Sequence, residues 1–134
     1  MNKILGLLLL FSSLLFSLEW EKDLDTAFEV AKKEQKVVMV LIEGEHCRWC
    51  TKMKQRTLSD EGVEKRLEKF VVVKVMREDA KAMSVLPQIN GVPTIFFMTA
   101  QKEVLESIVG YFDVTDFTSY INDVEKNINI VEIK

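Results

Sequence analysis

The chain has 134 residues, of which 48% are hydrophobic and 29% are charged, and this length and composition suffice for one folded domain. Such a chain is too hydrophobic for an intrinsically disordered protein and too short for a multidomain enzyme. The 18 lysines and arginines against 21 aspartates and glutamates give a net charge of -3, which argues against nucleic acid as a partner, because phosphate backbones attract basic proteins.

The N-terminus has the pattern of a secretory signal peptide. Lys3 precedes an apolar run over residues 4–18, and the charged part of the chain begins at Glu19. The run is shorter than the ~20 residues that span a bilayer comfortably, which favours cleavage, after Ser17, over an uncleaved membrane anchor. The sequence therefore predicts a signal peptide over 1–17 and a domain over 18–134 that is periplasmic or secreted, with the anchor as the alternative.

The first elements of the domain alternate between helix and strand. An apolar stripe of helical spacing begins at Leu24 and predicts a helix, and the apolar, mostly β-branched run 37–42 predicts a strand covered on both faces. After the loop 43–46, the segment from Cys47 to about Thr57 lacks glycine and proline and has apolar positions three and four residues apart. This spacing predicts a helix that begins at the first cysteine.

The middle of the chain repeats this alternation. Ser59 is expected to cap a helix whose first turn is acidic, and the run 70–76 predicts a second buried strand. A short helix is expected over 78–86, because Pro87 stops it, followed by a loop that leads into a strand over 94–98.

The C-terminal part predicts a hairpin and a helix. The run 104–109 is expected to pair antiparallel with the strand before it, and Gly110 ends it. A final helical stripe contains Phe117, Tyr120, Ile121 and Val124, and the tail 128–133 alternates imperfectly, as an added edge strand would. Together these elements predict an α/β fold: a three-layer sandwich with a mixed central sheet, helices on both faces, and a C-terminal antiparallel hairpin plus helix.

The chain's two cysteines form the motif Cys47-Arg48-Trp49-Cys50, at the expected junction of loop and helix. The unpaired amides of a helix N-terminus stabilise a thiolate, and cysteines one turn apart can close a disulfide. The first sulfur is expected to be exposed and the second to point toward the helix interior. Cys47 is therefore the expected attacking thiol and Cys50 the resolving thiol of a redox pair.

Other readings of the cysteines are weaker. A purely structural disulfide in so short a loop would contribute only roughly 2 kcal/mol. A zinc site needs about four ligands, and only His46 could join the cysteines. Covalent haem attachment needs a histidine directly after the second cysteine, where Thr51 stands. We expect no metal and no cofactor.

Side chains next to the cysteines are expected to tune the first thiol. Arg48, and His46 when protonated, favour the thiolate, whereas Glu43 and Glu45 oppose it. His46 is otherwise a bystander in an exposed loop. Trp49 is expected to contact a substrate or to cover the disulfide. The remaining basic side chains of this segment are expected on a solvated helix face: Lys52, Lys54 and Arg56.

The order of these motifs resembles the thioredoxin fold, in its secreted thioredoxin-like branch. A strand, a Cys-x-x-Cys helix and then Gly91-Val92-Pro93-Thr94 opening a strand span nearly the whole domain. The resemblance implies that Pro93 follows a cis peptide bond and faces the sulfur pair. It also implies that the backbone of Val92 binds a substrate strand.

The chain departs from thioredoxins proper at the positions that tune the chemistry. Thioredoxins carry Gly-Pro between the cysteines, where Arg48 and Trp49 stand, and a tryptophan where His46 stands. The buried aspartate six residues before the first cysteine is replaced by Leu41. Glu43 is then the nearest candidate to deprotonate Cys50.

The sequence thus predicts a thiol-disulfide oxidoreductase that acts outside the cytoplasm on cysteine-containing proteins. The acids before the helix favour a reductase or isomerase, kept reduced by a membrane-bound thiol-disulfide electron donor, over a primary oxidant. Two alternatives remain: a binding or chaperone module of the same fold with a structural disulfide, and a metal-handling thiol protein.

Overall fold

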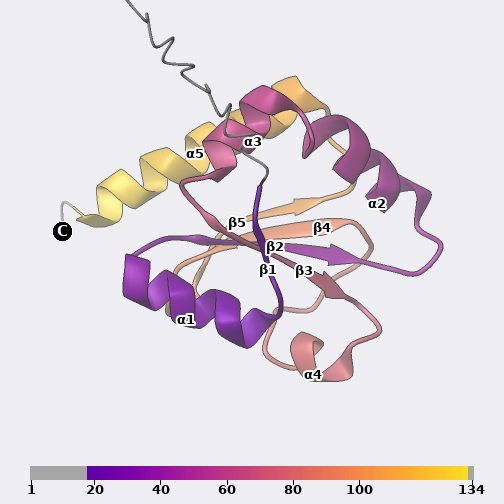
Figure 1. The fold of residues 1–134 in the computed structure, drawn as a ribbon, viewed down its shortest axis with the longest axis horizontal. Helices are drawn as coiled ribbons and strands as arrows, with labels where there is room; N and C mark the ends of the chain where they lie inside the picture. The colour runs from indigo at the N-terminus through magenta and orange to yellow at the C-terminus, as the bar shows by residue number, and fades with distance from the viewer. Residues whose placement is uncertain (1–17, 133–134) are drawn as a thin grey trace, which may run out of the picture.

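A five-stranded sheet forms the centre of the protein in the computed structural model, which describes residues 18–132 (Figure 1). The first three strands in the order β1-β3-β2-β4-β5 are parallel, and β4 and β5 are antiparallel to their neighbours, which confirms the predicted mixed sheet and hairpin. The predicted signal peptide lies outside the described residues. The strands are β1 (Trp20–Glu21), β2 (Val38–Glu43), β3 (Val71–Met76), β4 (Thr94–Met98) and β5 (Val104–Val109).

The middle strand β2 explains why its sequence is apolar throughout. All six of its residues are buried, because helices cover both faces of the sheet. Alternate side chains enter different layers: Val38, Val40 and Ile42 pack on one face, and Met39 and Leu41 on the other. The strand ends at Glu43, which therefore lies at the carboxyl end of the sheet's middle strand.

The helices divide between the two faces of the sheet (Figure 1). On one side lie α1 (Leu24–Glu34) and α4 (Ala80–Met83). On the other lie α2 (Arg48–Lys52), the π-helical segment η1 (Met53–Thr57), α3 (Glu61–Leu67) and α5 (Val114–Glu132). The second layer holds an aromatic centre, in which the Phe97 ring lies 5.3 Å from that of Phe70 and 6.3 Å from that of Phe117. These layers confirm the predicted sandwich.

The helix α3 is capped by a different residue from the one expected. The carboxylate of Asp60 accepts the N–H of Val63 at 3.1 Å and so caps α3, whereas the hydroxyl of Ser59 donates to the carbonyl of Gln55. The prediction of Ser59 was wrong because two adjacent residues can both cap a helix, and only the path of the preceding turn decides between them.

Both ends of the domain differ from the sequence prediction. The strand β1 was missed, because two residues carry no readable alternation; it pairs with β3, with Trp20 opposite Val72. The tail is not an edge strand, since α5 continues through Glu132. Ile128 extends the buried stripe of that helix and packs against the same layer as Phe117. No helix within residues 18–132 is long and apolar enough to span a membrane.

Candidate functional site

The cysteine pair lies where β2 ends and α2 begins. Cys47 is the N-cap of α2, and Cys50, one turn later, is joined to it by a disulfide with the two Cα atoms 5.3 Å apart. The backbone N–H of Cys50 donates to Sγ of Cys47 at 3.1 Å. Cys50 is only 2% exposed, whereas Cys47 is half-buried. The outward position of the first sulfur and the inward position of the second agree with the sequence prediction.

The segment before β4 packs against the first sulfur. The Val92–Pro93 peptide bond is cis, as predicted, and the carbonyl oxygen of Val92 lies 3.8 Å from Sγ of Cys47. Neither the N–H nor the C=O of Val92 takes part in a backbone hydrogen bond within residues 18–132. Val92 therefore presents an unpaired stretch of backbone beside the reactive sulfur, to which an extended peptide can add.

A buried carboxylate lies close to both cysteines. The Glu43 side chain is only 9% exposed and forms an ion pair with Lys54, which belongs to η1. The expectation that Lys54 is a freely solvated charge was therefore wrong. Glu43 and Lys54 line one hollow together with both cysteines; the other lining residues are Gly44, His46, Arg48, Thr51 and Met76. This places Glu43 on the same hollow as Cys50, the thiol it was predicted to deprotonate.

Aromatic and basic side chains meet where α2 lies next to the loop that follows β5. Trp49 is 45% exposed, and its ring lies 6.1 Å from that of Tyr111. The Nζ of Lys52 lies 5.0 Å from the Trp49 ring centre and 4.4 Å from that of Tyr111. The Arg48 guanidinium lies 5.3 Å from the Trp49 ring. Lys52 is thus held against rings rather than on a purely solvated face, contrary to expectation.

Sequence reasoning did not find Tyr111. It follows Gly110, which ends β5, and an aromatic residue after a strand-ending glycine carries no signal for a site. Two hydrogen bonds of the loop that carries Tyr111 hold this residue next to Trp49. The N–H of Gly110 donates to the carbonyl of Pro93 at 2.8 Å, and the buried hydroxyl of Thr57 donates to the carbonyl of Phe112 at 2.6 Å.

The loop before Cys47 is anchored by the chain that follows β3. The N–H of Glu45 donates to the carboxylate of Glu78 at 3.2 Å, and this bond holds the pKa of the Glu78 carboxyl below its ordinary value. A Cβ on Gly44 would lie 2.9 Å from Nε of Arg77 and 3.0 Å from Cγ2 of Val92, so a larger residue there would displace these side chains. His46 is exposed, with a φ of 52°. Among residues 18–132, its side chain takes part in no hydrogen bond or ion pair, and it lines the hollow described above.

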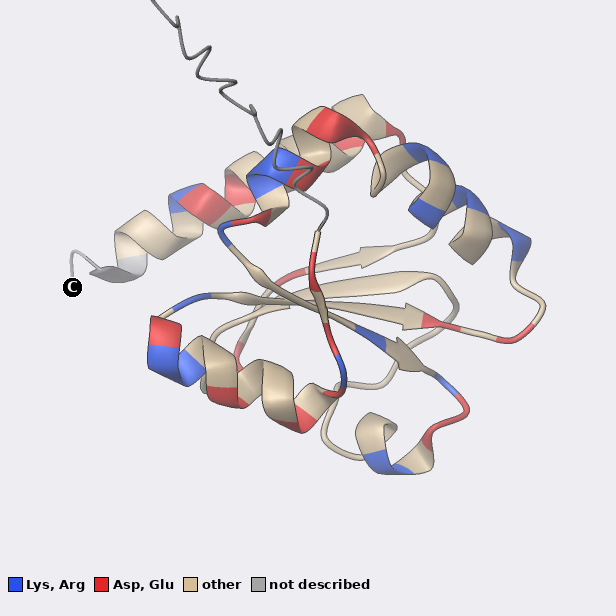
Figure 2. Ribbon diagram, in the orientation of Figure 1, with Lys and Arg blue, Asp and Glu red and all other residues tan. Residues whose placement is uncertain are grey.

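Charge is unevenly distributed around the site. Figure 2 shows basic residues recurring along α2 and the segment after it, and acidic residues at the end of β2 and in the following loop. Arg48, Lys52, Lys54 and Arg56 are the basic residues of that helical stretch, which contains no acid. The first thiol therefore faces cations on its helix side and carboxylates on its strand side.

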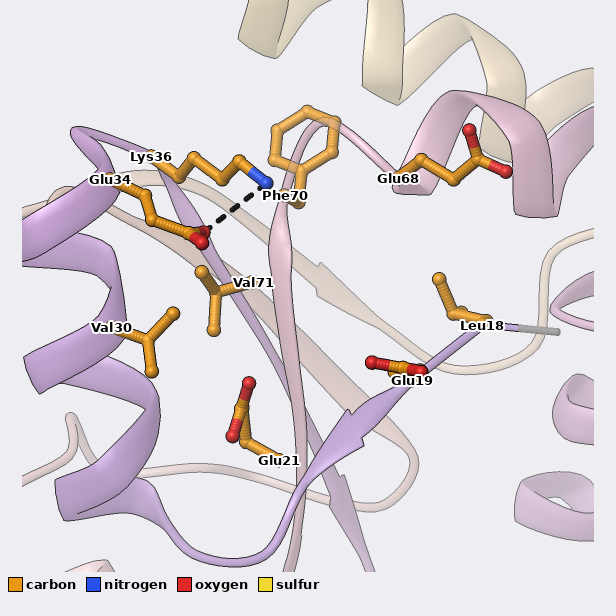
Figure 3. Close-up of a pocket in the computed structure, with 9 residues that line it drawn as sticks. All are labelled: Leu18, Glu19, Glu21, Val30, Glu34, Lys36, Glu68, Phe70 and Val71. Carbon is orange, nitrogen blue, oxygen red and sulfur yellow. Dashed lines mark ion pairs between the residues drawn. The ribbon is translucent and has the colours of Figure 1, made fainter. Parts of the chain in front are cut away.

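A second hollow, which neither cysteine lines, lies between β1, α1 and β3 (Figure 3). Its lining includes four glutamates and a lysine, of which Lys36 and Glu34 pair at 3.3 Å. It contains neither cysteine nor any residue of the predicted site. Within residues 18–132, no three histidine, cysteine, aspartate or glutamate side chains gather as metal ligands would.

Comparison with known proteins places this geometry in a family. The family model described as thioredoxin-like matches residues 19–100. The chain belongs to the thioredoxin-like family. Its strand-helix junction with the cysteine pair, and the Val92–Pro93 segment facing it, both lie within the matched residues.

Solved structures of thioredoxin-like proteins superpose on most of this chain. A thioredoxin from Thermus thermophilus is 28% identical, with a TM-score of 0.70 over 81% of this chain and 88% of that one. The DsbH oxidoreductase is 20% identical, with a TM-score of 0.70 over 83% and 86%. The C-terminal domain of DsbD from Neisseria meningitidis, in its reduced form, is 21% identical, with a TM-score of 0.60 over 73% and 90%. No curated protein sequence matches the chain.

This thioredoxin-like protein carries a disulfide-forming pair, Cys47 and Cys50, consistent with thiol-disulfide exchange. At the position where thioredoxins proper have a buried aspartate, Leu41 is fully buried among apolar side chains. The only charged side chain of β2 is that of Glu43, which lines the hollow beside the cysteines.

Proposed function

We propose that this protein is a thiol-disulfide oxidoreductase that exchanges disulfides with cysteine-containing proteins outside the cytoplasm. The observation that carries the proposal is the asymmetry of the pair: Cys47 is the outward sulfur and accepts the Cys50 N–H, while Cys50 is buried behind it. A backbone N–H aimed at a sulfur stabilises the thiolate more than the thiol. Cys47 is thus the nucleophile and Cys50 the resolving thiol.

The exchange proceeds in two displacements. The Cys47 thiolate attacks one sulfur of a substrate disulfide, forms a mixed disulfide and releases the other substrate sulfur as a thiolate. The deprotonated Cys50 then attacks Sγ of Cys47, closes the disulfide seen in the structure and releases the second substrate thiolate. Two electrons pass from the protein dithiol to the substrate, and the thiol protons pass to bases or water.

Other residues of the site have supporting roles in this proposal. The backbone of Val92, next to Pro93, pairs with the substrate chain beside its cysteine, and Trp49 covers the substrate from the helix side. Glu43 accepts the proton of Cys50, since its carboxylate lines the same hollow. Arg48 stabilises the thiolate by its positive charge, and His46 does so when it is protonated.

The direction of exchange follows from the balance of charges near Cys47. The helix N-terminus and Arg48 favour the thiolate, and the carboxylates of Glu43 and Glu45 oppose it, with Lys54 offsetting part of the charge of Glu43. Moderate thiolate stabilisation favours a more reducing pair than that of a primary oxidant, because a strong oxidant needs a strongly stabilised thiolate in its reduced form. The protein is then a reductase or isomerase, recharged by a membrane-bound thiol-disulfide donor.

The trapping of partners by single cysteine variants tests the assignment of roles. Cys50→Ser is expected to accumulate mixed disulfides in cells, because the resolving thiol is gone, and Cys47→Ser is expected to trap none. Both variants are expected to lose the reduction of insulin by the purified domain. Equal trapping by the two variants, or insulin reduction by Cys47→Ser, would show that the assignment is wrong.

The location is tested separately, by mass spectrometry of the native protein. A mature N-terminus at Leu18 in the periplasmic or secreted fraction is the expected result, since the apolar run over 4–18 is short for an anchor. Recovery of the full-length chain from membranes would instead show that the N-terminal segment stays uncleaved as a membrane anchor.

A further inference from the structure

Four side chains form a cationic aromatic surface beside the reactive sulfur: Arg48, Trp49, Lys52 and Tyr111. The two cations lie 4.4–5.3 Å from the ring centres. Among the ion pairs of residues 18–132, neither Arg48 nor Lys52 takes part in one, unlike Lys54, which pairs with Glu43. Stacking against a ring leaves the positive charge available, because the ring supplies no net negative charge. The two cations of this surface therefore have no anionic partner among the described residues.

This surface is held in a fixed relation to the substrate-facing backbone. The bond from Gly110 N–H to Pro93 C=O ties the loop of Tyr111 to the chain next to Val92. The bond from the Thr57 hydroxyl to the Phe112 carbonyl ties the same loop to η1, directly after the helix that carries Lys52. These two bonds hold the loop of Tyr111, against which Lys52 lies, next to the backbone with which a substrate peptide pairs.

The nearest buried carboxylate, that of Glu43, pairs with Lys54 and not with the cations of this surface. Glu43 and Arg48 both line the hollow described above, whereas Trp49, Lys52 and Tyr111 do not line it. Glu45 donates its N–H to Glu78, within the loops that follow β2 and β3. Because Glu43 is already paired, it does not neutralise Arg48 or Lys52. The positive charges of Arg48 and Lys52 therefore act on the residues that flank the substrate cysteine.

We propose that this surface selects substrates in which an acidic residue flanks the reactive cysteine. The inference rests on the proposed exchange function and names the substrate class of the same site. Residues of an extended chain advance about 3.3 Å each, so a side chain one or two positions from a cysteine bound at Cys47 lies near Arg48 and Lys52. Exposed charges at such separations change association by about tenfold at low salt.

The test measures the reduction of three peptide disulfides by the reduced protein. The peptides are symmetric dimers of acetyl-Ala-X-Cys-X-Ala-amide in which X is Glu, Gln or Lys. Each rate constant is divided by that for reduction of the same peptide by tris(hydroxypropyl)phosphine, an uncharged nucleophile, which removes the effect of X on the reactivity of the peptide's own disulfide. We expect a normalised Glu-to-Lys ratio of about ten at low ionic strength, falling several-fold at about 0.5 M salt.

Charge-removing variants locate the effect. Lys52→Gln is expected to lower the ratio about threefold, and Arg48→Gln with Lys52→Gln to bring it near one, because each cation supplies part of the attraction. Lys33→Gln, the same change on α1 at the opposite face of the sheet, is expected to keep the wild-type ratio. Comparing peptides within one variant cancels any change in the reactivity of Cys47.

The outcomes separate the two proposals. Wild-type protein that reduces insulin and all three peptides with a ratio near one would overturn the selectivity alone. So would a ratio that survives in the double variant, or a faster normalised rate with X as glutamine than with X as glutamate. Failure to reduce insulin or any peptide would overturn the exchange function, and the selectivity with it.

Discussion

The two ends of the central sheet are built in different ways. At the far end, where β2 begins and β4 passes into β5, each turn is closed by backbone hydrogen bonds between residues that are close in sequence. The N–H of Lys36 donates to Ala31 at 3.0 Å, and that of Thr99 to Glu103 at 2.8 Å. At the site end, where β2 and β3 finish and β4 begins, contacts join residues far apart in sequence, such as Cys47 with Val92.

The difference shows where polar groups are buried. The far end closes its turns with backbone bonds, and the ion pair of Lys36 with Glu34 beside them is exposed to solvent. The site end buries a carboxylate, Glu43, and a hydroxyl, Thr57, each satisfied by a single distant partner. Since an unpaired buried polar group costs more than a surface contact returns, removing one partner should matter at the site end and not at the far end.

The largest effect is expected from breaking the ion pair at the site end. Lys54→Met leaves the Glu43 carboxylate, whose side chain is 9% exposed, without its cation. We expect a loss of about 1–3 kcal/mol in the free energy of unfolding, measured by urea denaturation, because a largely buried charge loses its partner.

The matched change at the far end is Lys36→Met. Its pair with Glu34 joins side chains that are 36% and 51% exposed, and a solvent-exposed pair of this kind contributes about 0–0.5 kcal/mol. Double-mutant cycles with Glu43→Gln and Glu34→Gln measure the two coupling energies. Similar couplings at both ends would remove the contrast between them.

A smaller effect is expected from the hydroxyl of Thr57. This side chain is fully buried, and Thr57→Val keeps its shape but removes the donor to the Phe112 carbonyl. We expect a loss of about 1–2 kcal/mol, together with faster amide exchange in the loop that carries Tyr111. Thr118→Val is the control, because its hydroxyl donates within α5 to the Val114 carbonyl. A control loss as large as that of Thr57→Val would contradict the argument.

The same contrast explains what the sequence could predict of the fold. Helical stripes such as Leu24 to Ala31 and the apolar run of β2 are local patterns, and both were confirmed. The errors arose where local patterns are ambiguous or too short: the choice of Asp60 over Ser59 as cap, the two residues of β1, and the tail of α5.

The site was predictable to the extent that its signals are local. The cysteine pair is read directly from its spacing, and the cis Val92–Pro93 bond followed from resemblance to a known fold. The partner of Glu43 was not predicted, because the i to i+5 bond from Leu58 N–H to Met53 C=O alters the direction of side chains in η1. The contact of Tyr111 with Trp49 depends on how the loop after β5 packs, which no pattern near Gly110 reveals.

The smallest effect concerns the loop before Cys47, and it depends on pH. The N–H of Glu45 donates to the Glu78 carboxylate and lowers the pKa of that carboxyl. Because the pKa is lower in the folded state, the bond stabilises the loop fully above the ordinary glutamate pKa, and this stabilisation is lost as the pH falls through the lowered value. The Glu45 amide proton should therefore titrate in NMR spectra with a pKa below the ordinary glutamate value.

Glu78→Gln should abolish this titration, because an amide oxygen still accepts the bond but does not ionise. Asp23→Asn is the matched control: Asp23 caps α1, and its pKa is lowered by the N–H of Thr26. Its replacement should remove the corresponding titration at Thr26 while leaving that at Glu45 unchanged. If the Glu45 amide titrated at or above the ordinary glutamate pKa, or still titrated in Glu78→Gln, the loop would not be anchored by this carboxylate. The attachment of the site end to the chain after β3 would then rest on the backbone bond from the Arg77 N–H to the Glu43 carbonyl, at 2.8 Å.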